Sequence, residues 1–269
     1  MQPAPEKHIT RVYRNIPKWL PMVLSGECCG GLAPSMNKED PKEVWVHNKK
    51  MSDDRICRIE ASGAVKPSTI FTLLAAVASI QNNVGEISLE KTTITLVIND
   101  AKRWMLEYLG HNNHVEVSKD VRRLITYRIF WVSSNGDFST HAYVYDGELK
   151  KNRLTIVLKR AFVELCMQEG LRIEFMAMQK ELRRKPVAKL LYMYLCSNSA
   201  TEFCEETLIE RVGLTNGIRD NRRTLKKAFT NLLGKEEDGM VKEGFIASFN
   251  YDEVGRKFSY VENPKEIKV

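Results

Sequence analysis

The stretch IRDNRRTLKKAFTNLL, residues 218–233, is the segment around which this 269-residue chain is organised. Its apolar residues recur at i, i+3, i+4 and i+7, a spacing that predicts one amphipathic helix. The inward side of that helix would carry Ile218, Asn221, Leu225, Ala228, Phe229, Leu232 and Leu233. The outward side would carry Arg219, Arg223, Lys227 and Thr230, with Arg222 and Lys226 on the flanks. Five cations and one acid in this stretch give a basic stripe, which is either ordinary solvated surface or a surface suited to phosphates.

The segments on both sides of this helix favour the second interpretation. An apolar helix opened by Pro186 and a shorter helix ended by Gly213 precede it. A strand at 245–251, a turn at 252–255 and a return strand at 257–261 follow it. Three helices followed by a two-stranded ribbon are typical of a winged helix-turn-helix, whose last helix enters the major groove of DNA.

The winged helix-turn-helix interpretation assigns separate roles to the basic residues. Arg219 and Arg223, one helical turn apart, are the candidates for reading base edges. Contacts with backbone phosphates are expected from Lys226, Arg256 and Lys257, the last two at the tip of the ribbon. For Arg222 the sequence leaves two possibilities, a contact with a phosphate or a contact with an acid of the protein itself.

The runs RKPVAKLLYMYLCS, residues 184–197, and IRDNRRTLKKA, residues 218–228, resemble the C-terminal domain of plasmid replication initiators of the TrfA kind, which belong with the iteron-binding Rep initiators. The similarity continues more loosely back to about Thr69 and is absent from the first 45 residues. This resemblance implies tandem winged-helix domains that bind repeated origin sites and help to load the host replicative helicase, with the host initiator as a further partner. It also implies control of plasmid copy number and an exchange between dimers and monomers.

The N-terminal half repeats the same order of elements. From Pro67 the sequence predicts a buried helix capped by Ser68, a strand at 93–98, and a second helix at 100–109. A third helix, capped by Ser118, would carry Lys119, Arg122 and Arg123 at least partly outward. A hairpin through Asn135-Gly136 would join runs at 127–133 and 138–145. We therefore expect this half to be a second winged-helix domain.

These elements predict an α+β fold with two tandem winged-helix domains. The boundaries are a loosely ordered N-terminal arm and lead-in at 1–65, an N-terminal domain at 66–176 and a DNA-binding domain at 177–269. A strand at 154–158 and a helix at 159–167 are expected between the two winged helices, followed by a charged connector at 178–185. Because no flexible Gly/Ser linker separates the domains, we expect a fixed relative orientation.

Composition and missing motifs exclude several classes of function. The net charge of +7 suits a polyanionic partner, and the longest apolar run is too short for a membrane span, so we expect a cytoplasmic bacterial protein. Neither the Cys28-Cys29 pair nor the histidines of HNNH, residues 111–114, have the partners that a metal site needs. There is no phosphate-binding loop and no nucleophile beside a metal site, so the sequence predicts neither an enzyme nor a cofactor.

Two classes of function remain open. One is a replication initiator with two DNA-reading modules. The other is a transcriptional regulator that uses one winged helix and keeps its N-terminal domain for dimerisation or sensing. A basic, DNA-facing surface on the N-terminal domain would favour the initiator.

Overall fold

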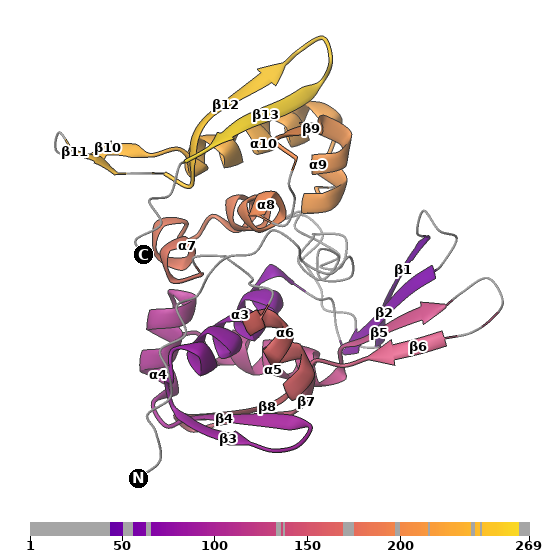
Figure 1. Cartoon of the computed structure of the whole chain (residues 1–269), viewed down its shortest axis with the longest axis vertical. Coiled ribbons are helices and arrows are strands. Elements are labelled where there is room, and N and C mark those ends of the chain that lie inside the picture. Colours follow the sequence, from indigo (N-terminus) through magenta and orange to yellow (C-terminus); the bar gives the residue numbers. More distant parts are fainter. Residues whose placement is uncertain are drawn as a thin grey trace.

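The computed structural model describes residues 44–50, 56–62, 66–132, 136, 138–168, 175–196, 200–214, 216–237, 240–242 and 244–263 (Figure 1). Most of the predicted N-terminal arm lies outside these ranges, as do Cys28, Cys29 and Asn135. The described residues form helices and antiparallel sheets, so the fold is α+β.

The N-terminal half is built on a four-stranded antiparallel sheet of order β3-β4-β8-β7. Its strands are β3 Glu86–Leu89, β4 Thr93–Ile98, β7 Val144–Lys150 and β8 Arg153–Lys159. In β4 and β8 every second residue is buried, because one face of the sheet packs against helices. Those helices are α3 Pro67–Gln81, α4 Ala101–Trp104, the π-helical turn η1 Met105–Leu109, α5 His114–Thr126 and α6 Arg160–Gln168.

Two helices of this half begin before the predicted capping residues. The prediction that Ser68 caps α3 is wrong, because α3 begins at Pro67 and the Ser68 hydroxyl donates instead to Asp120 Oδ1 at 3.1 Å. The prediction that Ser118 caps α5 is also wrong. Asn113 caps this helix by accepting from the backbone N–H of Glu116 at 3.2 Å, so Ser118 lies inside it.

A second four-stranded sheet, of order β1-β2-β5-β6, extends to one side of the N-terminal half (Figure 1). It contains β1 Val44–Lys50, β2 Ile56–Ser62, β5 Arg128–Val132 and β6 Phe138–His141. The predicted hairpin around Gly136 is therefore confirmed as the β5-β6 pair. The run predicted at 138–145 is divided between β6 and β7, which belong to different sheets.

The C-terminal half is organised around α10 Ile218–Leu232. It also contains α8 Pro186–Cys196, β9 Glu202–Cys204, α9 Glu205–Val212, the β10 Lys235–Glu237 and β11 Met240–Lys242 hairpin, and the ribbon of β12 Ile246–Asp252 and β13 Lys257–Glu262. The predicted helices and ribbon are confirmed, whereas β9 and the β10-β11 hairpin were not predicted. The connector predicted at 178–185 is partly helical, since α7 Phe175–Glu181 includes its first residues.

With α4 and η1 counted as one helix, and with β3 and the β5-β6 and β10-β11 hairpins left out, the order helix, strand, helix, helix, strand, strand recurs in the two halves with the same strand pairing. In the N-terminal half β8 lies between β7 and β4, and in the C-terminal half β13 lies between β12 and β9. The counterpart of the β12-β13 ribbon is therefore β7-β8. The prediction assigned that place to the Asn135-Gly136 hairpin, which is instead inserted between α5 and β7, as β10-β11 is between α10 and β12.

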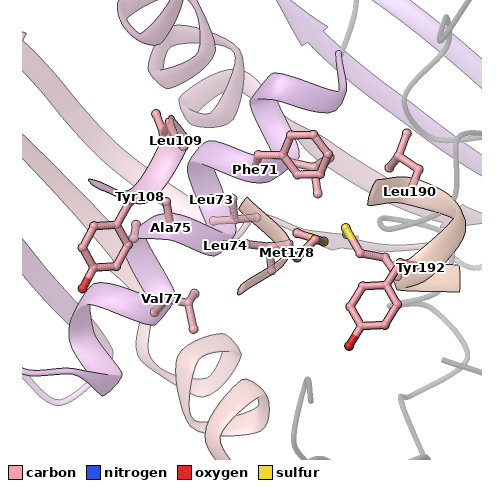
Figure 2. Close-up of a cluster of buried hydrophobic side chains, with 14 of the residues drawn as sticks. Phe71, Leu73, Leu74, Ala75, Val77, Tyr108, Leu109, Met178, Leu190 and Tyr192 are labelled. Atoms are coloured by element: carbon pink, nitrogen blue, oxygen red, sulfur yellow. The ribbon is translucent and has the colours of Figure 1, made fainter. Parts of the chain in front are cut away.

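One continuous hydrophobic cluster includes residues of both halves. Figure 2 shows Phe71 and Leu74 of α3 on one side of Met178 of α7, with Leu190 and Tyr192 of α8 on the other. Met178 and Leu190 are almost completely buried, so α7 joins the two halves by apolar packing.

Candidate nucleic-acid interface

The exposed side of α10 carries a row of cations. Arg219, Arg223 and Lys227 are all exposed and follow one another at intervals of four residues, so they lie along one side of the helix. None of the three forms an ion pair with another residue in the part of the chain that the structure describes. Arg219 and Arg223 also line a shallow concavity at the first turn of the helix, together with Gly217, Ile218 and Asp220.

The opposite side of α10 is buried much as its periodicity predicts. The buried residues are Asn221, Leu225, Ala228, Phe229 and Leu232. Ile218 is the exception: it was expected on the inward side but is 47% exposed. It is the first residue of the helix. The buried Phe229 ring stacks on Phe249 of β12 and Phe258 of β13, which fixes the helix against the ribbon.

Arg222 points to an acid of the protein itself. Its Nε donates to both oxygens of Glu205, at 3.0 and 3.1 Å, and the Glu205 residue has no exposed surface. The hydroxyl of Tyr251 donates to the same carboxylate at 2.7 Å. Burial alone would raise the pKa of Glu205, but the bonds from Arg222 and Tyr251 outweigh it, so the pKa lies below its ordinary value. Of the two contacts that the sequence left open for Arg222, the structure contains the one with an acid.

Lys226 is held beside the ribbon rather than along the exposed row. Its Nζ lies 4.3 Å from the centre of the Tyr251 ring and 3.0 Å from Glu253 Oε1. The cation–π contact and the ion pair direct this lysine towards the turn between β12 and β13. Thr230 is exposed, but its hydroxyl donates to the backbone oxygen of Lys226 at 2.9 Å. Its remaining lone pairs can still accept a hydrogen bond.

The tip of the β12-β13 ribbon contains cations and acids together. Arg256 is exposed in the left-handed backbone region, at φ 49°, and its carbonyl accepts from the Glu205 N–H at 2.8 Å. Lys257 donates to Glu202 of β9 at 2.7 Å. Because the ion pairs of Lys226 and Lys257 are solvent-exposed, each contributes little to stability, and the lysine can exchange its carboxylate for another anion.

In the N-terminal half the predicted basic stripe of α5 is only partly present. Lys119 and Arg122 are exposed. The expectation that Arg123 faces outward is wrong: its side chain is 2% exposed, and its Nη1 lies 3.0 Å from Asp120 Oδ1. It points inward because Asp120 is buried beside α3, where Ser68 and Thr69 also donate to Oδ1. Burial raises the pKa of Asp120 to about 6, against the opposing effects of these hydroxyls and Arg123.

The structure thus separates the predicted DNA-contacting residues into exposed cations without an ion pair and residues that bond to other groups of the protein. Arg219, Arg223, Lys227, Arg256, Lys119 and Arg122 are exposed, and no ion pair joins them to the described part of the chain. The acids that hold the other cations, chiefly Glu205 and Glu202, were not identified from the sequence. They lie on α9 and β9, so no periodicity within α10 or the ribbon points to them.

Comparison with protein-family models and with curated proteins finds no match for this chain. Among the described residues no helix is both long and apolar enough to cross a membrane. Within the same residues no group of three or more His, Cys, Asp or Glu side chains is placed to hold a metal ion.

Proposed function

We propose that this protein binds double-stranded DNA and that α10 is the recognition helix of a winged helix-turn-helix. The observation that carries this proposal is the row of Arg219, Arg223 and Lys227, exposed and unpaired within the described residues, beside cations that acids hold in place. A cation that must first release a carboxylate of the protein gains less binding free energy from a phosphate than an unpaired cation does. A rigid helix with an unpaired basic row fits the major groove.

Within this proposal the roles divide along α10 and the ribbon. Arg219 and Arg223, near the helix N-terminus, read base edges, with bidentate pairing to guanine as the favoured contact. Lys227, Arg256 and Lys257 bind backbone phosphates, Lys257 after releasing Glu202. Arg222 positions α10 through Glu205.

We further infer that the protein is a plasmid replication initiator of the TrfA kind, acting at repeated origin sites. The recurrence of element order and strand pairing supports two DNA-reading modules, one in each half. Exposure of Lys119 and Arg122 on α5, the counterpart of α10, favours this assignment over a regulator with a single DNA-reading helix. Recruitment of the host helicase and the host initiator belongs to the same proposal and comes from the sequence resemblance alone.

DNase I footprinting with the full chain on the DNA that flanks its gene tests this function. Protection of several directly repeated sites, lost in Arg223→Ala and kept in Lys91→Ala, is the expected result. Lys91 is a suitable control because it is an exposed lysine in the β3-β4 turn of the other half. Protection of one inverted repeat would favour the transcriptional regulator, and no sequence-specific protection would contradict DNA recognition by α10.

A further inference from the structure

A pocket of about 560 Å³ lies at the junction of the two halves, away from the exposed row of α10. Its walls come from the start of α3, the end of η1 and the residues after it, the end of α7 and the first turn of α8. The two longer helices, α3 and α8, both begin at this pocket, with Pro67 and Pro186 in its lining. The positive ends of both helix dipoles therefore lie at the pocket.

The charged and ionisable side chains that line the pocket are all basic. They are Lys66, His111, Arg183, Arg184, Lys185 and Lys189, and no carboxylate is among the described lining residues. Arg183, Arg184 and Lys189 bring like charges to one cavity and repel one another unless a counter-charge lies between them. A ligand with more than one negative charge fits this wall better than a singly charged one.

Lys189 is the most unusual of these residues, because it is only 6% exposed. Its Nζ donates to Gln179 Oε1 and lies 5.1 Å from the centre of the Phe71 ring. No carboxylate pairs with it among the residues that the structure describes. A buried ammonium group without a counter-ion is costly, and burial lowers the pKa of Lys189 to about 8.

Gln179 provides a second sign of a missing partner. The residue is 2% exposed, and its Nε2 is buried without a hydrogen-bond partner in the described structure. Its Oε1 is already used by Lys189, so the amide group offers a donor to the pocket. A buried donor left unpaired costs about 1–3 kcal/mol, which an acceptor on a ligand would offset.

The pocket also has an apolar wall, formed by Phe71, Leu106 and Leu109. Leu106 is 51% exposed, so this side of the pocket presents apolar surface that a ligand can contact. This wall suits a flat ring system adjoining the anionic group. The combination of a ring and several negative charges describes a nucleoside polyphosphate.

We propose that this pocket binds a nucleoside polyphosphate, with its phosphates on Lys189, Gln179 and the arginines after α7, and its base on the apolar wall. The site is distinct from the proposed DNA-binding surface. Because α3 and η1 belong to one half and α8 to the other, the bound nucleotide contacts both halves. Nucleotide binding therefore stabilises the arrangement of the halves seen in Figure 1.

Calorimetric titration of the full chain with ADP, ATP, adenosine and inorganic phosphate tests the proposal. We expect saturable binding of ADP and ATP, and at least tenfold weaker binding of adenosine and of phosphate. Lys189→Met and Arg184→Ala should each weaken ADP binding at least tenfold, whereas Lys91→Ala should bind ADP like the parent. Because Arg184 is exposed, its replacement leaves the core intact even if Lys189→Met perturbs folding.

Three results would overturn the proposal. The first is no saturable binding of either nucleotide at millimolar concentration. The second is equal binding of phosphate and ADP, which would remove the role of the apolar wall. The third is unchanged ADP affinity in a folded Arg184→Ala variant. None of these results depends on DNA binding, so failure here leaves the function of α10 untouched.

Discussion

Arg222 Nε lies 3.0 Å from Glu205 Oε1, and through this contact α10 is tied to the first turn of α9. The Glu205 residue is fully buried and also accepts from Tyr251 of β12. One carboxylate therefore joins α9, α10 and the ribbon, the three elements that the proposed winged helix-turn-helix would hold in fixed relation to DNA. The same contact explains why Arg222 differs from its neighbour Arg223, which faces solvent.

Replacing Glu205 with Gln should destabilise the C-terminal half. The substitution removes the negative charge from a buried carboxylate and leaves the partly exposed guanidinium of Arg222 with a neutral acceptor, at a cost of about 1–3 kcal/mol. Urea unfolding at pH 7 measures this cost. Glu206→Gln, on the same turn but exposed, is the matched control and should change stability by less than about 0.5 kcal/mol.

The contribution of the Glu205–Arg222 pair to stability should decrease as the pH falls. The folded-state pKa of Glu205 is lowered, so the unfolded chain takes up a proton first as the pH falls. The stabilisation from Glu205 is complete above the ordinary glutamate pKa and is lost as the pH falls through the folded-state value. The difference in stability between wild type and Glu205→Gln should therefore shrink below about pH 4. A difference that grows in acid would contradict the ion pair.

Arg223→Ala and Lys257→Ala should affect DNA binding in different ways. Loss of Arg223 should cost on the order of 1–3 kcal/mol, mostly as lost discrimination between cognate and scrambled duplexes. Loss of Lys257 should weaken both duplexes by similar and smaller factors, because Lys257 must first give up Glu202. Binding measured at two salt concentrations separates the effects. Equal loss of specificity in the two variants would mean that α10 is not in the groove.

The contribution of the N-terminal half is tested by replacing Lys119 and Arg122 together with Ala. For every DNA phosphate that the variant no longer neutralises, the slope of log affinity against log salt concentration should fall in magnitude by about 0.9. Arg123 is left in place, because it is buried against Asp120 and its removal would report on folding. Unchanged affinity at all salt concentrations would assign this half to dimerisation or sensing.

Replacing Asp120 and replacing Arg123 should lower the free energy of unfolding by unequal amounts. Asp120→Ala removes the closer of two carboxylates from a buried guanidinium that cannot lose its proton, and Glu116 Oε1 at 3.6 Å remains, so we expect a loss of up to about 3–5 kcal/mol. Arg123→Met should cost less, because the pKa of Asp120 is already about 6 and the carboxyl can become neutral. Since the folded state of that variant binds the proton more tightly than the unfolded chain, its stability should rise from pH 7.5 to 5.5.

Thermal and urea unfolding of both variants measure this asymmetry. Arg122→Met is the control, since Arg122 is the adjacent arginine on α5 and is exposed. Equal costs for Asp120→Ala and Arg123→Met, with no effect of pH, would contradict the proposed protonation.

Lys189→Met should stabilise the protein at pH 7, on the order of a few kcal/mol at most. The folded-state pKa of Lys189 is about 8 against an ordinary 10.5, so between these values only the unfolded chain keeps the proton and wild-type stability rises with pH. The groups around Lys189 are Gln179 and the Phe71 ring, with the charges of His111 and Arg183 nearby. His111 has a lowered pKa and titrates below this range. The advantage of Lys189→Met should therefore shrink from pH 7 to pH 10, and a constant difference would contradict burial of the ammonium.

Local pattern was sufficient to predict most of the elements that form the candidate site. The helical periodicity of residues 218–233, Pro186 at the start of α8 and Gly213 after α9 are short-range signals, because they act within one or two turns. Alternation and the turn at 252–255 predicted the ribbon for the same reason. The sequence also determined the net positive charge and the absence of a phosphate-binding loop.

The tertiary structure alone decided which of those cations are free to meet a ligand. Arg122 and Arg123 are adjacent in sequence, yet one is exposed and the other is buried, because Asp120 is packed against Thr69 of a distant helix. Likewise Lys257 meets Glu202, 55 residues away. The pairing of β4 with β8 and the burial of Lys189 between the two halves also depend on contacts between residues far apart in the chain. Periodicity reports which side of an element is apolar, but the partner that each charge finds is set only when distant elements pack together.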